Sequence, residues 1–254
     1  MSILRDAGGA WPYRYPVSFW TSTNAGAKDG VFTVQPSFGG FWEKLDAPGY
    51  ELRITNETGD IQLAYNRSAY TYATRSITIQ VNDIPVAAGT TKLIWLYWGQ
   101  DGAADGDTDP TITAPISGVV TNLLPTAPMV SFRPERPAST VPAQSVTKSI
   151  AEVQDVWWNL SGLLSRAASP DGGYTEAEEV DAVSFAVFDA DSSQAGMFEA
   201  NQTAFAELKG VLYVRTRWKA GSAAGIYTLR LTVTTTTGRT AETRVVGYVT
   251  DLQE

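Results

Sequence analysis

The stretch Thr91–Pro110, "TKLIWLYWGQDGAADGDTDP", decides how we divide the chain. Its first half is almost wholly apolar from Leu93 to Trp98, which predicts a central strand buried on both faces, with Trp95 in the core. Its second half holds four aspartates, and Asp105, Asp107 and Asp109 alternate with other residues. Asp and Gly are typical of solvated turns, so this half predicts a hydrated hinge after the strand.

The alternating aspartates also make the loop a candidate calcium site. Calcium takes six to eight oxygen ligands, and carboxylates in a turn can supply some of them. The stretch lacks the glycine and the late glutamate of an EF-hand loop, and no second acidic segment is obvious. We keep Asp105, Asp107 and Asp109 as candidate calcium ligands, and no other cofactor is expected.

Short strands and turns fill the chain before this stretch. "YRYPVSFW" (13–20), "YELRITN" (50–56) and "RSITIQV" (75–81) carry branched and aromatic residues, with clear alternation in the last two. An Asp-Gly step at Asp29–Gly30 predicts a turn. Strands at this spacing indicate a β-sandwich over residues 1–104.

The composition changes between residues 105 and 148, where Pro, Ala, Thr and Ser dominate. Closely spaced prolines disfavour a central strand and favour extended backbone. We therefore expect an extended Pro-rich linker here, carrying one or two short strands such as "SGVVTNL" and "MVSF".

Strands return over residues 149–254. The segment 225–249 alternates along "GIYTLRLTV", turns at Gly238 and returns as "AETRVVGYV", which predicts a hairpin. The segment 152–164 allows two interpretations, because Val153, Trp157, Leu160 and Leu164 also fit helical spacing. Plain strands elsewhere favour a second sandwich of immunoglobulin type, so the fold class is all-β with two β-sandwich domains.

The composition limits the possible functions. The net charge is −8 and no basic run is present, so nucleic acid and anionic membranes are poor partners. The chain has no Cys and no His, which removes disulfides and His-dependent catalytic arrangements. We expect no signal peptide, because Arg5 and Asp6 stand where an apolar segment would be, and no membrane insertion, because no stretch approaches ~18 uninterrupted apolar residues. Synthesis and folding in the cytoplasm follow from this expectation.

The first domain resembles a jelly-roll-like domain of unknown function, the DUF2341 type. The residues that carry the resemblance are Trp11, "YRYPV", "YELRIT" and "LIWLYWGQDGAAD", in the expected order over about residues 10–105. The resemblance implies a jelly-roll-like sandwich of a kind found in secreted bacterial proteins and in phages. It carries no known activity and therefore no catalytic residues.

The second domain resembles Ig-like domains of tailed-phage structural proteins, such as fibre and tail-adaptor proteins. "QDVWWNLSGLL", "VDAVSFAV" and "GIYTLRLTVTTTTGRTAETRVV" carry this resemblance. It implies a strand over 156–160 instead of the helix that the spacing in 152–164 also allows. The long segment 188–210 departs from the family pattern and leaves the strand register there open.

Two groups of residues are candidates for binding. Tyr70 and Tyr72 lie in a loose segment and could face outward as a platform for stacking a sugar ring, although large aromatics more often fill sandwich cores. Arg133 and Arg136 lie in "RPERP", which is either a solvated linker or a strap that docks on a neighbouring subunit. Carboxylates such as Glu57 lie at turns and strand starts, where charge is expected without catalysis.

These observations favour a non-enzymatic virion structural protein of a tailed bacteriophage. It would serve as a capsid decoration, head-fibre or tail/fibre-adaptor subunit, made in the host cytoplasm and located in the virion. Its partners would be other virion proteins and further copies of itself in a homo-oligomer. The alternative is a carbohydrate-binding module that recognises a host surface glycan.

Overall fold

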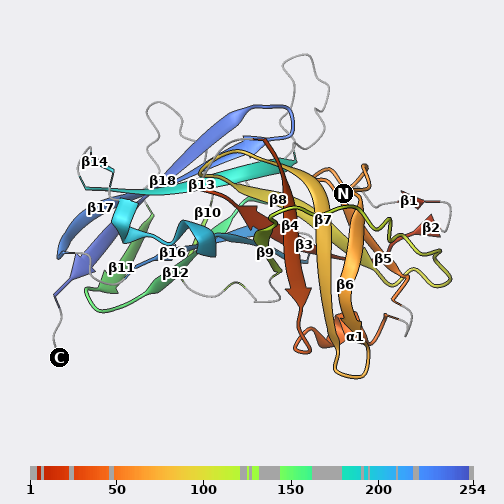
Figure 1. The fold of residues 1–254 in the computed structure, drawn as a ribbon. Helices are drawn as coiled ribbons and strands as arrows, with labels where there is room; N and C mark the ends of the chain where they lie inside the picture. Colours follow the sequence, from red (N-terminus) through yellow and green to blue (C-terminus); the bar gives the residue numbers. More distant parts are fainter. Residues whose placement is uncertain are drawn as a thin grey trace, which may run out of the picture. The chain divides into compact units, whose positions relative to one another are not determined.

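The computed structural model of the chain describes residues 5–6, 9–22, 26–45, 49–120, 125, 128–131, 144–161, 179–189, 192–193, 195–209, 211–219 and 223–251. The chain divides into two compact units, Met1–Leu123 and Leu124–Glu254. Both are built from strands, so the predicted all-β class is confirmed (Figure 1). No helix in the described ranges has the length and apolar character to cross a bilayer.

Unit 1 is a β-sandwich whose strands follow the order β5-β8-β3-β9-β4-β7-β6, with the small pair β1-β2 beside it. A short helix, α1 (Gly39–Trp42), follows β4. The strands are β1 (Arg5–Asp6), β2 (Gly9–Ala10), β3 (Tyr13–Trp20), β4 (Gly26–Val34), β5 (Leu52–Thr55), β6 (Tyr65–Thr71), β7 (Ser76–Val86), β8 (Thr91–Trp98) and β9 (Ile116–Val120).

The predicted central strand is β8, between β3 and β5. Every residue of β8 is buried, and Trp95 is only 5% exposed, which confirms its place among the buried residues. Ile94, Leu96 and Trp98 join the core cluster of unit 1, where Trp98 packs against Phe41 of α1 at a ring distance of 5.5 Å. Large apolar side chains at alternate positions therefore hold the two layers together.

The expected linker over 105–148 needs correction. Its residues 116–120 form β9, which pairs in parallel with β4 and antiparallel with β3, inside unit 1. Met129–Ser131 forms β10 and Ser145–Ser149 forms β11, and both pair within unit 2. The division of the chain falls between Leu123 and Leu124. The two short strands expected within the segment overlap β9 and β10, but their partner strands are distant in sequence, so their place in the two units had no local signal.

The predicted turn at Asp29–Gly30 is wrong. These residues lie inside β4, where the register with β7 shifts between Lys28 and Gly30. Asp83 of β7 adopts φ 55° at this irregularity. Such a β-bulge places an extra residue of one strand opposite its partner and locally increases twist. Asn82 and Asp83 of β7 lie opposite the single residue Asp29, so the Asp-Gly step lies across from the bulge.

Unit 2 has two sheets, ordered β10-β12-β16-β15 and β11-β18-β17-β13, with β14 paired to β13. Two 3₁₀ turns, Ala195–Met197 and Ala200–Gln202, precede β15. The strands are β10 (Met129–Ser131), β11 (Ser145–Ser149), β12 (Gln154–Asn159), β13 (Val180–Asp189), β14 (Ser192–Ser193), β15 (Ala204–Leu208), β16 (Val211–Trp218), β17 (Gly225–Thr235) and β18 (Thr240–Thr250).

Aromatic contacts join the inner faces of these sheets. Trp158 of β12 meets Phe185 of β13 at a ring distance of 6.0 Å, and Trp218 of β16 meets Tyr227 of β17 at 5.9 Å. Strand β12 replaces the helical alternative for the segment that begins at Glu152. The hairpin of β17 and β18 is confirmed, and Gly238 in its turn has φ 79°. Such a φ favours glycine.

Lys148 of β11 lies inside unit 2 instead of at its surface. Its side chain is 2% exposed, and Nζ donates to the carbonyls of Ser149 (3.2 Å) and Glu152 (3.1 Å). Nζ also lies 5.1 Å from the ring centre of Trp218. Burial lowers the pKa of Lys148, because desolvation disfavours the charged ammonium.

We predict that Lys148 makes the free energy of unfolding depend on alkaline pH. A lysine with a lowered folded pKa binds fewer protons than the unfolded chain, so stability should rise between the folded pKa and about 10.4. Lys148→Met should remove this rise, measured by urea unfolding from pH 7 to 10, and change stability at pH 7 by no more than about 1 kcal/mol. Lys148→Ala should cost about 2–3 kcal/mol by leaving a cavity. Equal pH profiles for wild type and Lys148→Met would contradict this account.

Candidate functional site

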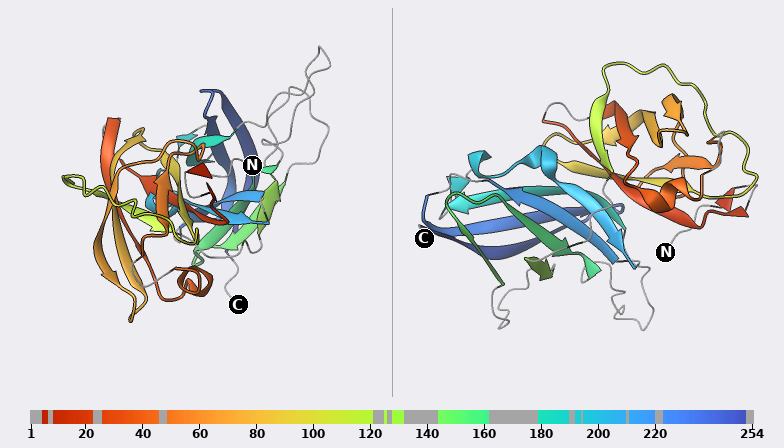
Figure 2. Two further views of the ribbon diagram at one scale, coloured as in Figure 1. Left: turned by 90° about the vertical axis from the view of Figure 1, so that its right-hand side faces the viewer. Right: turned by 90° about the horizontal axis from the view of Figure 1, so that it is seen from below.

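The aspartate-rich stretch belongs to a segment that we call the belt, residues 99–115, which joins β8 to β9. It contains no strand, and in Figure 2 its yellow-green trace follows the outside of unit 1 until β9 begins. Side chains from β4, β5 and β6 hold it at separate points. The belt is therefore part of the sandwich and not a hinge leading away from it.

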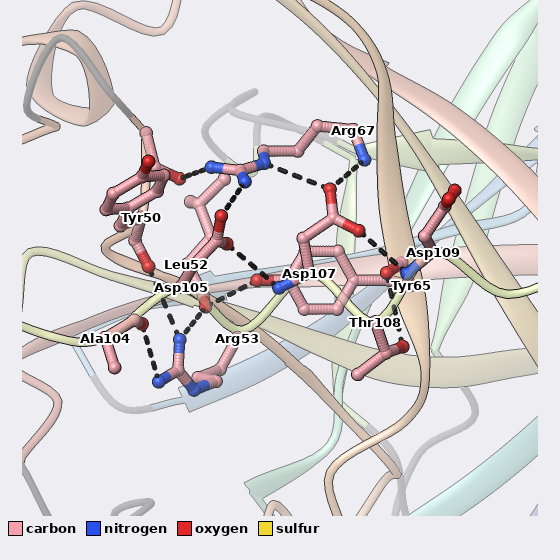
Figure 3. Close-up of polar contacts among 11 residues, drawn as sticks. Tyr50, Leu52, Arg53, Tyr65, Arg67, Ala104, Asp105, Asp107, Thr108 and Asp109 are labelled. Atoms are coloured by element: carbon pink, nitrogen blue, oxygen red, sulfur yellow. Dashed lines mark hydrogen bonds and ion pairs between the residues drawn. The ribbon is translucent and has the colours of Figure 1, made fainter.

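Arg67 of β6 binds the two central aspartates of the belt. Its Nη2 lies 2.5 Å from Asp105 Oδ2, and its Nε lies 3.3 Å from Asp107 Oδ2. The backbone N–H of Arg67 donates to the same Asp107 oxygen at 2.9 Å. Figure 3 shows the guanidinium directed at both carboxylates. The side chain of Arg67 is 11% exposed, that of Asp107 19% and that of Asp105 36%, so water screens the pair with Asp107 less than the pair with Asp105.

The other carboxylate oxygens hold the belt's own backbone. Asp105 Oδ1 accepts the N–H of Asp107 at 3.0 Å, and Asp107 Oδ1 accepts the N–H of Asp109 at 2.9 Å. An aspartate that accepts the amide two residues later forms an Asx turn, which is a local alternative to sheet pairing. The alternating spacing thus produces two linked turns.

These contacts give the carboxylates partners other than calcium, and the calcium site stays a prediction. Each carboxylate oxygen of Asp105 and Asp107 already accepts a hydrogen bond, and the cation beside them is the guanidinium of Arg67. Among the described residues, no group of three or more acidic, His or Cys side chains is placed to hold a metal ion. The residue types that suit calcium also suit an arginine clamp.

The belt also covers the outer edge of β6, the terminal strand of its sheet. Tyr65 O accepts the N–H of Thr108 at 3.0 Å, and Arg67 N donates to Asp107. One backbone group that a neighbouring strand would use is therefore occupied at each of these two residues. Covering a terminal strand with a loop prevents unwanted pairing with other chains.

Arg53 of β5 holds the beginning of the belt from the other side. It is 6% exposed, and its Nη2 donates to Ala104 O at 3.0 Å while Nη1 donates to Leu52 O at 2.6 Å. Tyr65 donates its hydroxyl to the same Leu52 carbonyl at 2.8 Å. A Cβ at Gly106 would lie 2.5 Å from Arg53 Nη1, so the belt approaches this arginine too closely for a side chain there.

Two more contacts lie around Arg67. Its Nη1 donates to Gly49 O at 2.8 Å, and its guanidinium carbon lies 5.2 Å from the ring centre of Tyr50. Burial works to lower the pKa of Arg67, but the hydrogen bonds and charges of the two aspartates raise it overall. Burial raises the pKa of the Tyr65 hydroxyl well above its ordinary value. Both groups therefore keep their protons at neutral pH.

A further contact lies at the bulge in β4. Asp29 Oδ2 accepts the N–H of Thr113 at 2.6 Å, while Oδ1 accepts Asn82 Nδ2 at 2.9 Å and the N–H of Asp83 at 3.3 Å. Burial works to raise the pKa of Asp29, but the hydrogen bonds that it accepts lower it below its ordinary value. The bulge thus fastens the last part of the belt.

The structure separates the two candidate sugar-binding tyrosines. Tyr70 is half-buried and packs against the core cluster of unit 1, whereas Tyr72 is 45% exposed. They do not form a shared exposed platform. Arg133 and Arg136 lie outside the described residues. Glu57 pairs with Lys92 at 2.9 Å.

No local pattern in the sequence marks Arg67, Arg53 or Asp29 as a partner of the belt. Arg67 and Asp105 are 38 positions apart, and no local pattern connects them. The repeated Asx spacing was the available signal, because it indicates carboxylates that bind backbone amides. It could have predicted the turns, but not the arginine.

Comparisons with known proteins add little to this description. No family model matches the chain, and no curated protein matches it. Among solved structures, it is similar to the N-terminal Ig1-2 module of the Drosophila receptor protein tyrosine phosphatase DLAR. The identity is 7%, the match covers 93% of this chain and 99% of that one, and the TM-score is 0.19. The resemblances noted in the sequence therefore stay predictions.

We predict that Arg67→Met will lower the stability of unit 1 by about 1–2 kcal/mol, because it leaves the partly buried Asp107 and the exposed Asp105 without their cation. Arg67→Lys should cost less but still be measurable, since one ammonium cannot replace the fork of a guanidinium. Thermal and urea unfolding would measure both. A loss below about 0.5 kcal/mol for Arg67→Met would place these contacts among ordinary surface ion pairs.

Calcium provides the control for this prediction. Because the carboxylates already bind Arg67 and backbone amides, calcium or a chelator should leave the wild-type melting temperature unchanged. A ligand that binds the folded chain raises its melting temperature with concentration. A calcium-dependent rise that Asp105→Asn and Asp107→Asn abolish would contradict the arginine clamp.

Proposed function

We propose that this chain is a non-enzymatic structural subunit of a tailed-phage virion, acting through protein–protein contacts. It would serve as a capsid decoration, head-fibre or tail/fibre-adaptor protein, made in the host cytoplasm and carried in the particle. The observation that carries this proposal is that unit 1 uses its charged groups to close its own sandwich edge. Such a unit would act as a rigid subunit that functions through the shape of its surface.

The opposite edge of unit 1 supports the same conclusion. The outer side of β5 is covered by the segment that follows it, where Leu63 N donates to Ile54 O at 2.8 Å and Asn56 N donates to Ile61 O at 3.0 Å. Subunits that assemble in many copies meet at high local concentration. Closed strand edges then limit pairing to intended surfaces.

Unit 2 offers surfaces suited to such contacts. Ile226 of β17 is 65% exposed and lies directly opposite Tyr248 of β18, which is 40% exposed. Adjacent exposed apolar side chains on one sheet face are typical of an interaction surface. We infer that unit 2 makes contacts with other virion proteins or further copies of the chain.

Particle composition tests the proposed function. Mass spectrometry of virions purified from a lysate of the host should detect the chain at a constant copy number per particle. Antibodies against the chain should label one location on the particle, such as the head or the tail. Absence of the chain from purified particles, with the protein free in the lysate, would contradict a structural role.

The exposure of Tyr72 keeps the carbohydrate-binding module as a second candidate. A glycan array should show no specific signal if the chain is only a scaffold. Specific binding that Tyr72→Ala abolishes, with unfolding unchanged, would favour glycan recognition. Because Tyr70 packs on the core, Tyr70→Ala is expected to lower stability and serves as the comparison.

A further inference from the structure

The edge of one sheet of unit 2 differs from the closed edges of unit 1. Strand β11 is the terminal strand of the sheet β11-β18-β17-β13 and pairs in parallel with β18. Val246 N donates to Gln144 O at 3.0 Å, and Ile150 N donates to Thr250 O at 3.2 Å. Even-numbered residues here direct their backbone groups toward β18, so Ser145, Thr147 and Ser149 direct theirs to the open side.

Among the described residues, bonds on the open side of β11 cover Ser149 and neither Ser145 nor Thr147. Ser149 N donates to a carboxylate oxygen of Glu152 at 3.2 Å, and Ser149 O accepts the N–H of Glu152 and the ammonium of Lys148. Ser145 and Thr147 are exposed, and no bond from their backbone groups on that side occurs within the described residues. In the part of the chain that the structure describes, one N–H and one C=O at each residue are therefore left for a partner strand.

The side chains of β11 do not protect this edge. Natural edge strands often carry outward lysines, prolines or bulges that block pairing. In β11 the one charged residue, Lys148, is buried, and the pairing with β18 has no register shift. The outward residues, Ser145 and Thr147, are small, neutral and compatible with a sheet.

We propose that β11 is the interface for a second copy of this chain, paired antiparallel across a two-fold axis. This inference deepens the proposed function by naming the surface and the partner of the homo-oligomer. The two sheets would join edge to edge into one continuous sheet. An isologous interface uses the same strand in both copies, so the strand must be complementary to itself.

One register satisfies the available groups. With Val146 opposite Val146 of the second copy, Ser145 faces Thr147 of the other strand on both sides of the axis. Each such pair exchanges both of its backbone hydrogen bonds, which uses the open N–H and C=O groups of both copies. Ser–Thr pairs are favourable cross-strand neighbours. A register centred on Thr147 would instead place Ser145 opposite the covered Ser149.

The oligomeric state of the full chain tests this interface. Sedimentation velocity and light scattering over a concentration series should give a dimer for the wild type. Thr147→Pro removes an outward N–H, and proline is tolerated on an edge strand, so this variant should stay folded and become monomeric. A wild type that is monomeric throughout, or a Thr147→Pro variant with unchanged dimerisation, overturns the proposal.

Charge substitutions test the register independently of proline. Ser145→Lys with Thr147→Lys places lysines opposite each other and should weaken the dimer at least about tenfold. The matched control adds the same charges at the β17–β18 turn, Thr237→Lys with Thr240→Lys, and should leave the dimer unchanged. Ser145→Lys with Thr147→Glu should restore it, because each lysine then faces a glutamate. Failure of this restoration would overturn the register centred on Val146.

These outcomes are separable from those of the proposed function. A dimer that forms without the β11 edge overturns this interface but leaves a structural role intact. A chain missing from virions that still dimerises through β11 would contradict the virion role and keep the interface. Binding of an extended segment from another protein to β11, without self-association, would replace the second copy as the occupant.

Discussion

The guanidinium of Arg67 between Asp105 and Asp107 is the interaction on which unit 1 depends. It converts an exposed acidic stretch into a fixed part of the sandwich and brings the belt's amides to the edge of β6. Because the belt leads directly into β9, its path also determines where that strand enters between β3 and β4. An isolated exposed ion pair would contribute little. Here the arginine is largely buried and its hydrogen bonds run to several groups, which is the geometry that contributes most.

The clamp explains why an acidic loop need not bind a metal. Carboxylates in a turn require a cation or N–H donors, and this chain provides both from β6 and from the turn itself. The resulting edge resembles a strand pair in which aspartate oxygens replace part of the backbone. Unit 1 is thereby closed at β6, whereas within the described residues no backbone bond covers the open side of β11 at Ser145 and Thr147. This contrast is the physical basis for assigning assembly contacts to unit 2.

Much of the fold was predictable because it has local signals. The alternation in 225–249 predicted β17 and β18, and the apolar run to Trp98 predicted β8. The path of 105–120 was not predictable, because β9 pairs with strands far away in sequence and has only moderate strand character. Asp29–Gly30 suggested a turn because bulges and hairpins favour the same residue types. The candidate site shows the same division. The spacing of the aspartates in the sequence indicated carboxylates that bind backbone amides, whereas no sequence pattern indicated Arg67 as their partner.

Amide hydrogen exchange tests the central account most directly. The N–H groups of Arg67, Thr108 and Thr113 bind Asp107, Tyr65 O and Asp29 respectively. If the belt is part of the sandwich, these amides should exchange almost as slowly as core amides of β7, since their opening requires unit 1 to open. Exchange as fast as that of an unprotected loop at these amides would mean that the belt detaches freely, and would contradict the account.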